Sequence, residues 1–145
     1  MSLFAKAGGR KTAWAVLAFA SIAAVSFYVR MAIAIVAIPS AHHDDALFTD
    51  LAYYVRQGQW LGPYTHLTLA KGAGYPVFLA LVNTLNLPVK LAEHAVYITA
   101  SVALSVMAGL LYKSRRAAVF IFLCLAVNPA LWSHGAQRIT RESFY

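Results

Sequence analysis

Long uncharged stretches dominate the pattern of hydrophobic and polar residues along this chain. The first covers residues 12–29, and after Arg30 the apolar character continues to residue 38. Two more such stretches follow, at 95–112 and 117–137. A helix needs roughly 20 residues to cross the hydrocarbon core of a bilayer. The pattern therefore predicts three membrane-spanning helices, at about 12–32, 89–111 and 117–136.

The limits of these spans follow from particular residues. The second span reaches back to Val89 if Lys90, Glu93 and His94 lie at an interface. Asn128-Pro129 bends or ends the third helix, because proline breaks the backbone hydrogen bonding of a helix. The first stretch is too long for the apolar region of a signal peptide, roughly 7–15 residues, so it is interpreted as a retained anchor.

The loop between the first two spans, about 39–88, has a pattern of its own. Its apolar residues recur with the helical period, and they are Leu47, Phe48, Leu51, Tyr54 and Val55. Asp44 or Asp45 caps the start of this helix and Gly58 ends it. Such a helix is expected to lie flat on the membrane surface.

A second short apolar helix is predicted from Pro76 to about Leu87, after a turn at 60–64. It is too short to span a bilayer, so an interfacial or re-entrant position is expected. The pattern as a whole predicts an all-α integral membrane protein. Residues 1–145 form a single membrane domain, with three transmembrane helices and interfacial helices in the first outward loop.

The composition agrees with a membrane protein. Of the 145 residues, 61% are hydrophobic and 12% are charged, and the mean hydropathy is +0.63. Soluble domains have about 45–50% apolar and about 25% charged residues, and disordered chains have few apolar ones. The single cysteine, Cys124, excludes an internal disulfide framework and a Cys-type zinc site.

The charges indicate an orientation. The net charge is +7, and the basic residues cluster before the first span (Lys6, Arg10, Lys11) and between the second and third (Lys113, Arg115, Arg116). These clusters lie on one side if all three segments cross, and the positive-inside rule makes that side cytoplasmic. The loop 39–88 and the tail from about residue 133 then face outward. The basic excess is thus interpreted as a topology signal, with no nucleic acid as partner.

Asp44-Asp45 is the first candidate for chemistry. Two adjacent carboxylates beside a span can supply a general base or hold a divalent metal through oxygen; the alternative is a helix cap. The histidines map to outward segments or outer span ends, and they are His42, His43, His66, His94 and His134. Their spacing matches no zinc or haem pattern, so interfacial histidines are favoured and no metal ligand set is assigned.

Two further groups carry charges on the outward side. Lys71 lies in a glycine-rich turn before the helix near Pro76, where it can meet a phosphate; the alternative is a hinge with a solvated lysine. Arg138, Arg141 and Glu142 share one face of a helix. They suit the lining of an aqueous cavity, and the alternative is an ordinary charged stretch beside the membrane.

Two segments of the chain, HDDALFTDLAYYVRQGQWLGPYTHLTLAKGAGYPVFLAL and RITRESFY, resemble bacterial members of the GT-C-type membrane glycosyltransferases. These enzymes are relatives of protein O-mannosyltransferases and of the aminoarabinose transferases of lipid A. The resemblance extends from Thr12 to Tyr145. It implies sugar transfer from a polyprenyl-phosphate donor on the outward, periplasmic face of the bacterial inner membrane, with the N-terminus in the cytoplasm.

The resemblance also assigns roles to residues. Asp44 or Asp45 becomes the catalytic base or metal contact, and Glu142 corresponds to a second acidic motif. Arg138 and Arg141 lie near the donor phosphate, for which Lys71 is a further candidate. Such enzymes have roughly a dozen spans, so the chain is expected to be the N-terminal part of a larger transferase and inactive alone.

Other classes remain open. The main alternative is a non-catalytic membrane assembly or scaffold subunit whose outward loop binds a partner. A small transporter component is disfavoured, because Arg30 is the only ionisable residue well inside a predicted span.

Overall fold

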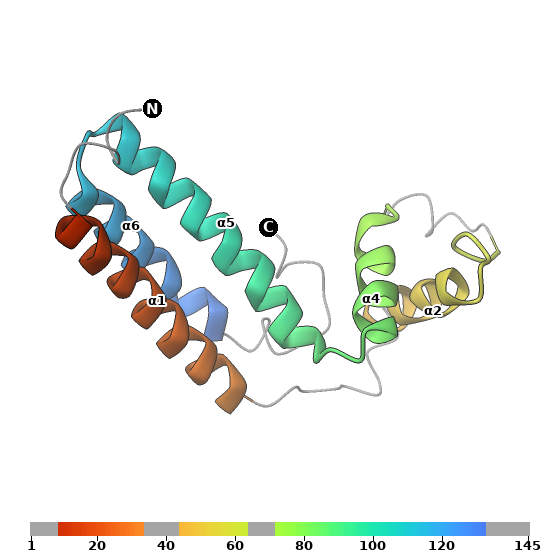
Figure 1. The fold of residues 1–145 in the computed structure, drawn as a ribbon. Coiled ribbons are helices and arrows are strands. Elements are labelled where there is room, and N and C mark those ends of the chain that lie inside the picture. Colours follow the sequence, from red (N-terminus) through yellow and green to blue (C-terminus); the bar gives the residue numbers. More distant parts are fainter. Residues whose placement is uncertain (1–8, 34–43, 64–71, 133–145) are drawn as a thin grey trace. The chain divides into compact units, whose positions relative to one another are not determined.

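The computed structural model of the chain describes residues 9–33, 44–63 and 72–132. Within these ranges all regular structure is helical, as the sequence predicts (Figure 1). The helices are α1 (Gly9–Ala32), α2 (Asp44–Arg56), α4 (Gly74–Thr84), α5 (Val89–Leu111), α6 (Arg115–Ala126) and the short 3-10 helix η1 (Pro129–Trp132).

Among the described residues, two helices are long and apolar enough to cross a membrane. They are Thr12–Ala32 within α1, with 21 residues, and the whole of α5, with 23. At 1.5 Å per residue these lengths are about 32 and 35 Å, enough for a hydrocarbon core of about 30 Å. Only 6% and 22% of their apolar windows are buried within the chain. Both helices have the limits predicted for the first two spans.

The third predicted span, 117–136, is not confirmed. Helix α6 has 12 residues and ends at Ala126, and η1 follows after Val127 and Asn128. Twelve helical residues cover about 18 Å, which is less than the hydrocarbon core. The predicted interruption at Asn128-Pro129 is confirmed, since Pro129 has no N–H to continue the helix. Residues 133–136 lie outside the described part of the chain.

The chain divides into two compact units, which are described separately. The first contains α1, α5 from His94 onward, and α6; the second contains α2, α4 and the first five residues of α5. The single membrane domain predicted for residues 1–145 is therefore not tested as such.

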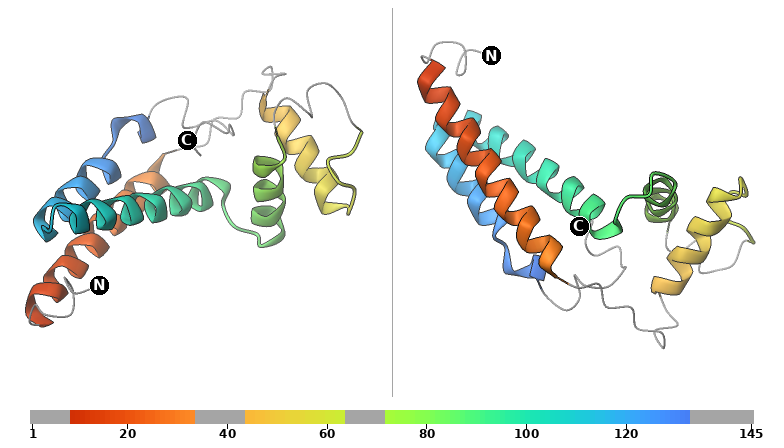
Figure 2. Two further views of the ribbon diagram at one scale, coloured as in Figure 1. Left: turned by 90° about the horizontal axis from the view of Figure 1, so that it is seen from above. Right: turned by 60° about the horizontal axis from the view of Figure 1, so that its bottom comes forward.

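In the first unit, α1 packs against α6 (Figure 2). The ring of Phe19 stacks on that of Phe122, with 4.6 Å between the centroids. Phe122 is fully buried in a core that α5 completes with Ile98. Helices α5 and α6 approach closely at Gly109, where an added Cβ would lie 2.6 Å from the Cβ of Ala118. Small residues allow this approach, as they do between membrane helices.

In the second unit, α2 packs against α4. Its core contains Phe48 and Ala52 from α2 with Tyr75, Leu79 and Ala80 from α4. The ring of Phe48 meets that of Tyr75 edge-on, at a centroid distance of 5.1 Å. The amphipathic pattern predicted for α2 is thus confirmed, and part of its apolar face is covered by α4. Its predicted position flat on a membrane is not confirmed.

The ends of α2 and α4 follow from local chemistry. Helix α2 starts at Asp44 and ends before Gly58, which has φ +75°, as predicted. Helix α4 starts at Gly74, earlier than the predicted Pro76, because proline is tolerated in the first turn, where N–H groups have no helical partner. The helix ends at Thr84, before the predicted end near Leu87. Asn86 follows in the left-handed region with φ +53°.

Candidate functional site

The predicted acid pair opens α2. Asp44 and Asp45 are its first two residues, the position at which carboxylates favour the helix dipole. Their backbone is helical, and their side chains lie outside the described part of the structure. This placement agrees with the capping alternative and equally with a base or metal contact, so the choice between them stays open.

The other predicted site residues lie outside the described ranges. They are Lys71, Arg138, Arg141 and Glu142, together with His42, His43, His66 and His134. Their predicted gathering on one membrane face is therefore not tested. Within residues 9–33, 44–63 and 72–132, no three His, Cys, Asp or Glu side chains are placed to hold a metal ion, and no reaction step is assigned to one.

The structure shows two buried polar clusters that the pattern of the sequence did not predict. The first lies in the second unit, where the start of α5 meets α4. Lys90 and Glu93 are 6% and 3% exposed, and Nζ of Lys90 lies 2.7 Å from Oε2 of Glu93. The hydroxyl of Tyr75 donates a hydrogen bond to Oε1 of the same carboxylate.

This first cluster joins two helices through one carboxylate. Each oxygen of Glu93 has a donor: the phenol of Tyr75, 18 residues earlier, and the ammonium of Lys90, one helical turn earlier. A buried charge is costly unless it is paired and hydrogen-bonded. The predicted position of Lys90 and Glu93 at a membrane interface is not tested, but within the chain both side chains are buried. The arrangement is that of a structural ion pair between α4 and α5.

The second cluster lies in the first unit and centres on Ser26 of α1. Its hydroxyl donates to the carbonyl of Ala126 at 2.9 Å, and its Oγ lies 3.0 Å from Nε2 of His94. Ser26 and His94 are 4% and 3% exposed. The rings of Phe27 and His94 pack edge to face, with 4.7 Å between their centroids. His94 is thus buried within the unit, and its predicted position at a membrane interface is not tested.

The hydrogen-bond geometry fixes the direction of the Ser26–His94 contact. A hydroxyl has one proton, and that of Ser26 is directed at Ala126. Nε2 of His94 must therefore carry a proton and donate to Oγ. In a nucleophilic serine the imidazole accepts the hydroxyl proton instead. The pair as it stands is arranged to connect α1, α5 and α6, and it is not arranged to activate Ser26.

The same cluster supplies donors at the end of α6. Pro129 cannot donate to the carbonyl of Leu125. That carbonyl accepts from the N–H of Asn128 at 3.2 Å and from the hydroxyl of Tyr97 at 2.8 Å. The N–H of Ala130 is directed to Oδ1 of Asn128, and Ser26 serves the carbonyl of Ala126 instead.

Arg30 makes a further contact with a backbone carbonyl, one that follows the proline. It is 7% exposed, and its Nη1 donates to the carbonyl of Leu131 in η1 at 3.2 Å. Side chains from neighbouring helices commonly satisfy backbone groups that a proline leaves unpaired in membrane proteins. A sequence signal for this arrangement exists: Ser26 and Arg30 are four residues apart on one helix face, and a proline interrupts a later apolar helix.

Comparison of the chain with protein-family models, with curated protein sequences and with solved structures gave no significant match.

Proposed function

We propose that the chain is the N-terminal membrane part of a GT-C-type glycosyltransferase. It would act on the outward face of a bacterial inner membrane, with a polyprenyl-phosphate sugar as donor. The observation that supports this proposal is the position of Asp44 and Asp45. They begin a helix in the segment that connects the two helices able to cross a membrane. A lipid-linked donor needs the enzyme's reacting groups near the membrane surface, because its lipid tail stays in the bilayer.

The proposed topology has three crossings and a cytoplasmic N-terminus. Helices α1 and α5 supply the first two crossings, and α6 together with the residues after it supplies the third. Residues 39–88 then face outward, with α2 and α4 at the membrane surface. The basic residues before α1 and between α5 and α6 support this orientation through the positive-inside rule.

The proposed chemistry is displacement at the anomeric carbon of the donor sugar. The acceptor hydroxyl forms the new glycosidic bond, the bond between sugar and phosphate breaks, and polyprenyl phosphate leaves. Asp44 or Asp45 takes the hydroxyl proton, a contribution of about 10²–10⁴-fold to the rate. Arg138, Arg141 and Lys71 bind the departing phosphate, which gains charge, and Glu142 is a second acid or an orienting partner.

The test removes the acid pair and compares it with a neighbouring acid. Asp50 lies on the same helix, is exposed and has no assigned role, so Asp50→Asn is the matched control. In membranes containing the complete gene product, we expect the Asp44→Asn/Asp45→Asn double variant to lose at least about 100-fold in sugar transfer. Asp50→Asn should stay near the unchanged protein. Full activity in a normally accumulated double variant would contradict the proposal.

A second function, a scaffold subunit whose outward segment binds a partner, is supported by exposed aromatic residues in the second unit. Tyr53 and Trp60 are 58% and 59% exposed, and exposed tyrosine and tryptophan are enriched in protein interfaces. Crosslinking in membranes discriminates between the two functions. For a scaffold, Tyr53→Ser/Trp60→Ser abolishes the crosslinked product, and Asp44→Asn/Asp45→Asn leaves it unchanged.

A further inference from the structure

We propose that a groove in the first unit binds one anionic phospholipid. The acyl chain lies along the apolar lining, and the phosphate lies at the basic end beside Arg115. This inference rests on the chain being in a membrane and is independent of the proposed sugar transfer.

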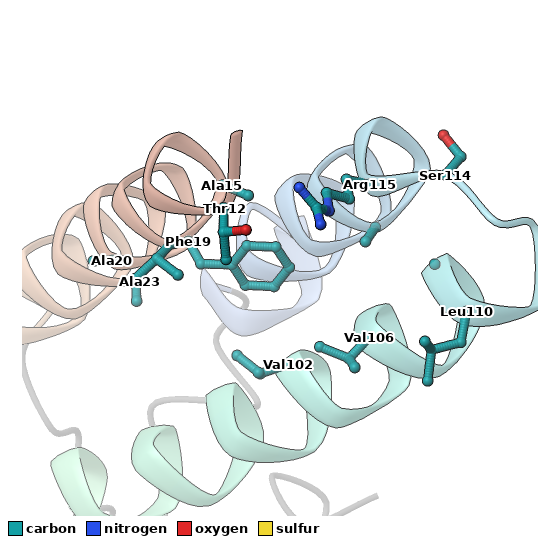
Figure 3. Close-up of a pocket in the computed structure, with 13 residues that line it drawn as sticks. Thr12, Ala15, Phe19, Ala20, Ala23, Val102, Val106, Leu110, Ser114 and Arg115 are labelled. Carbon is teal, nitrogen blue, oxygen red and sulfur yellow. The ribbon is translucent and has the colours of Figure 1, made fainter. Parts of the chain in front are cut away.

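The groove is bounded by α1, α5 and the start of α6 (Figure 3). Its volume is about 430 Å³, within the range of roughly 300–1,000 Å³ typical of ligand sites. Helix α1 contributes Phe19 and several alanines, and α5 contributes Val102, Val106 and Leu110. Almost all of the lining is apolar, so it suits a hydrocarbon chain and offers nothing to a polar ligand along most of its length.

Polar groups gather at one end of the groove. Thr12, Ser114 and Arg115 all line it, and Figure 3 shows Arg115 extending from α6 on the side that faces α1. Ser114 caps α6 by accepting a hydrogen bond from the N–H of Ala117. Its hydroxyl is therefore engaged in the helix start, and Arg115 is the charged group at the groove itself.

The charge of this end complements an anion. The segments of the first unit, Met1–Ile33 and His94–Trp132, contain no Asp or Glu. Arg10 and Lys11 directly precede Thr12, and Lys113 and Arg116 flank Ser114 and Arg115. Arginine binds phosphate in a bidentate manner, and basic pockets between membrane helices bind anionic lipid head groups. An apolar groove ending in a basic cluster complements a phospholipid in both of its parts.

The first test concerns the acyl chain. Native mass spectrometry of the full 145-residue chain in detergent would count retained phosphatidylglycerol, with phosphatidylcholine of the same chains for comparison. Ala20 and Ala24 are both exposed alanines of α1, and only Ala20 lines the groove. We expect Ala20→Trp to reduce phosphatidylglycerol retention at least about fivefold and Ala24→Trp to leave it unchanged. Val106→Phe, which fills the groove from α5, should act like Ala20→Trp; circular dichroism checks the fold of each variant.

The second test concerns the head group. We expect phosphatidylglycerol to be retained at least about fivefold better than phosphatidylcholine, and Arg115→Gln to remove that preference. Arg56→Gln, which removes the same charge from an exposed position on α2, should keep it. Excess inorganic phosphate should not displace the lipid, because the acyl chain contributes to binding.

Three results would overturn the proposal. Equal lipid retention by Ala20→Trp and Ala24→Trp would mean that the acyl chain lies elsewhere. Displacement by inorganic phosphate alone would reduce the site to an ion site. Unchanged lipid retention with an altered oligomeric state in Ala20→Trp would assign the groove to a second copy of the chain.

Discussion

Ser26 serves two buried partners with one hydroxyl group. It donates to the carbonyl of Ala126 and accepts from Nε2 of His94, so its loss leaves a buried acceptor and a buried donor without their partner. An unsatisfied buried polar group costs about 1–3 kcal/mol. This contrasts with Ser105, whose hydroxyl bonds to the carbonyl of Ser101 in its own helix.

We therefore expect Ser26→Ala to lower the free energy of unfolding by about 2 kcal/mol. Ser105→Ala, at an equally buried serine, should lower it by less than about 0.5 kcal/mol, because the carbonyl of Ser101 keeps its helical partner. Denaturant titration in detergent, followed by circular dichroism, measures both. Equal losses in the two variants would contradict the proposed role of the Ser26 bridge.

Glu93 gives a second prediction at this scale. Glu93→Gln removes the negative charge beside the buried ammonium of Lys90, whereas Tyr75→Phe removes one neutral donor. Breaking a buried ion pair costs about 3–5 kcal/mol, and an ordinary hydrogen bond about 1 kcal/mol. Glu93→Gln should therefore be the more destabilising change by about 2 kcal/mol in the same titration. The control is the double variant Lys90→Met/Glu93→Leu, which should recover much of the loss, and failure to do so would argue against an ion pair.

At the scale of elements, the end of α6 explains a tyrosine in an apolar helix. The hydroxyl of Tyr97 donates to the carbonyl of Leu125, which also accepts from the N–H of Asn128. Pro129 has no N–H with which to make the regular helical bond to this carbonyl. In a Pro129→Ala background the new N–H at position 129 can make this bond. We expect Tyr97→Phe to cost about 1 kcal/mol in the natural sequence and close to nothing in that background. A double-mutant cycle on the unfolding free energy tests this, and equal costs in the two backgrounds would refute it.

The helices themselves were largely predictable. Asp44 and Gly58 mark the two ends of α2, and the apolar run with Arg30 as its one charge marks Thr12–Ala32 as a helix able to cross a membrane. Asn128-Pro129 marks the end of α6. These signals are local, since caps, breakers and charge-free runs act within a few residues.

The polar clusters were not predictable from such signals. Glu93 meets a donor 18 residues away and His94 meets Ser26 at a separation of 68 residues. A pattern read along the chain cannot anticipate such partners, because they come from other helices. Of the predicted site, only the backbone of Asp44 and Asp45 is described, and the joint role of these acids with Arg138, Arg141 and Glu142 stays a prediction.

At the scale of the molecule, the proposed topology is directly measurable. Single cysteines at Thr65→Cys and Lys113→Cys, in a Cys124→Ser background, report the two sides of the membrane. We expect an impermeant thiol reagent to label the Thr65→Cys chain on intact cells and the Lys113→Cys chain only after permeabilisation, because the proposed topology puts the basic cluster on the cytoplasmic side. Labelling of the Lys113→Cys chain alone on intact cells would contradict the proposed topology.

The broken end of α6 also has a consequence for biosynthesis. Two of its carbonyls accept hydrogen bonds from Ser26 and Tyr97, which belong to helices that leave the ribosome before α6 does. When Leu125 and Ala126 are translated, both partners already exist, and so does Arg30 for the carbonyl of Leu131. Each side-chain donor is thus synthesised before the carbonyl that it binds. Pro129 is added to the chain after Ser26 and Tyr97, the residues that compensate for its missing N–H.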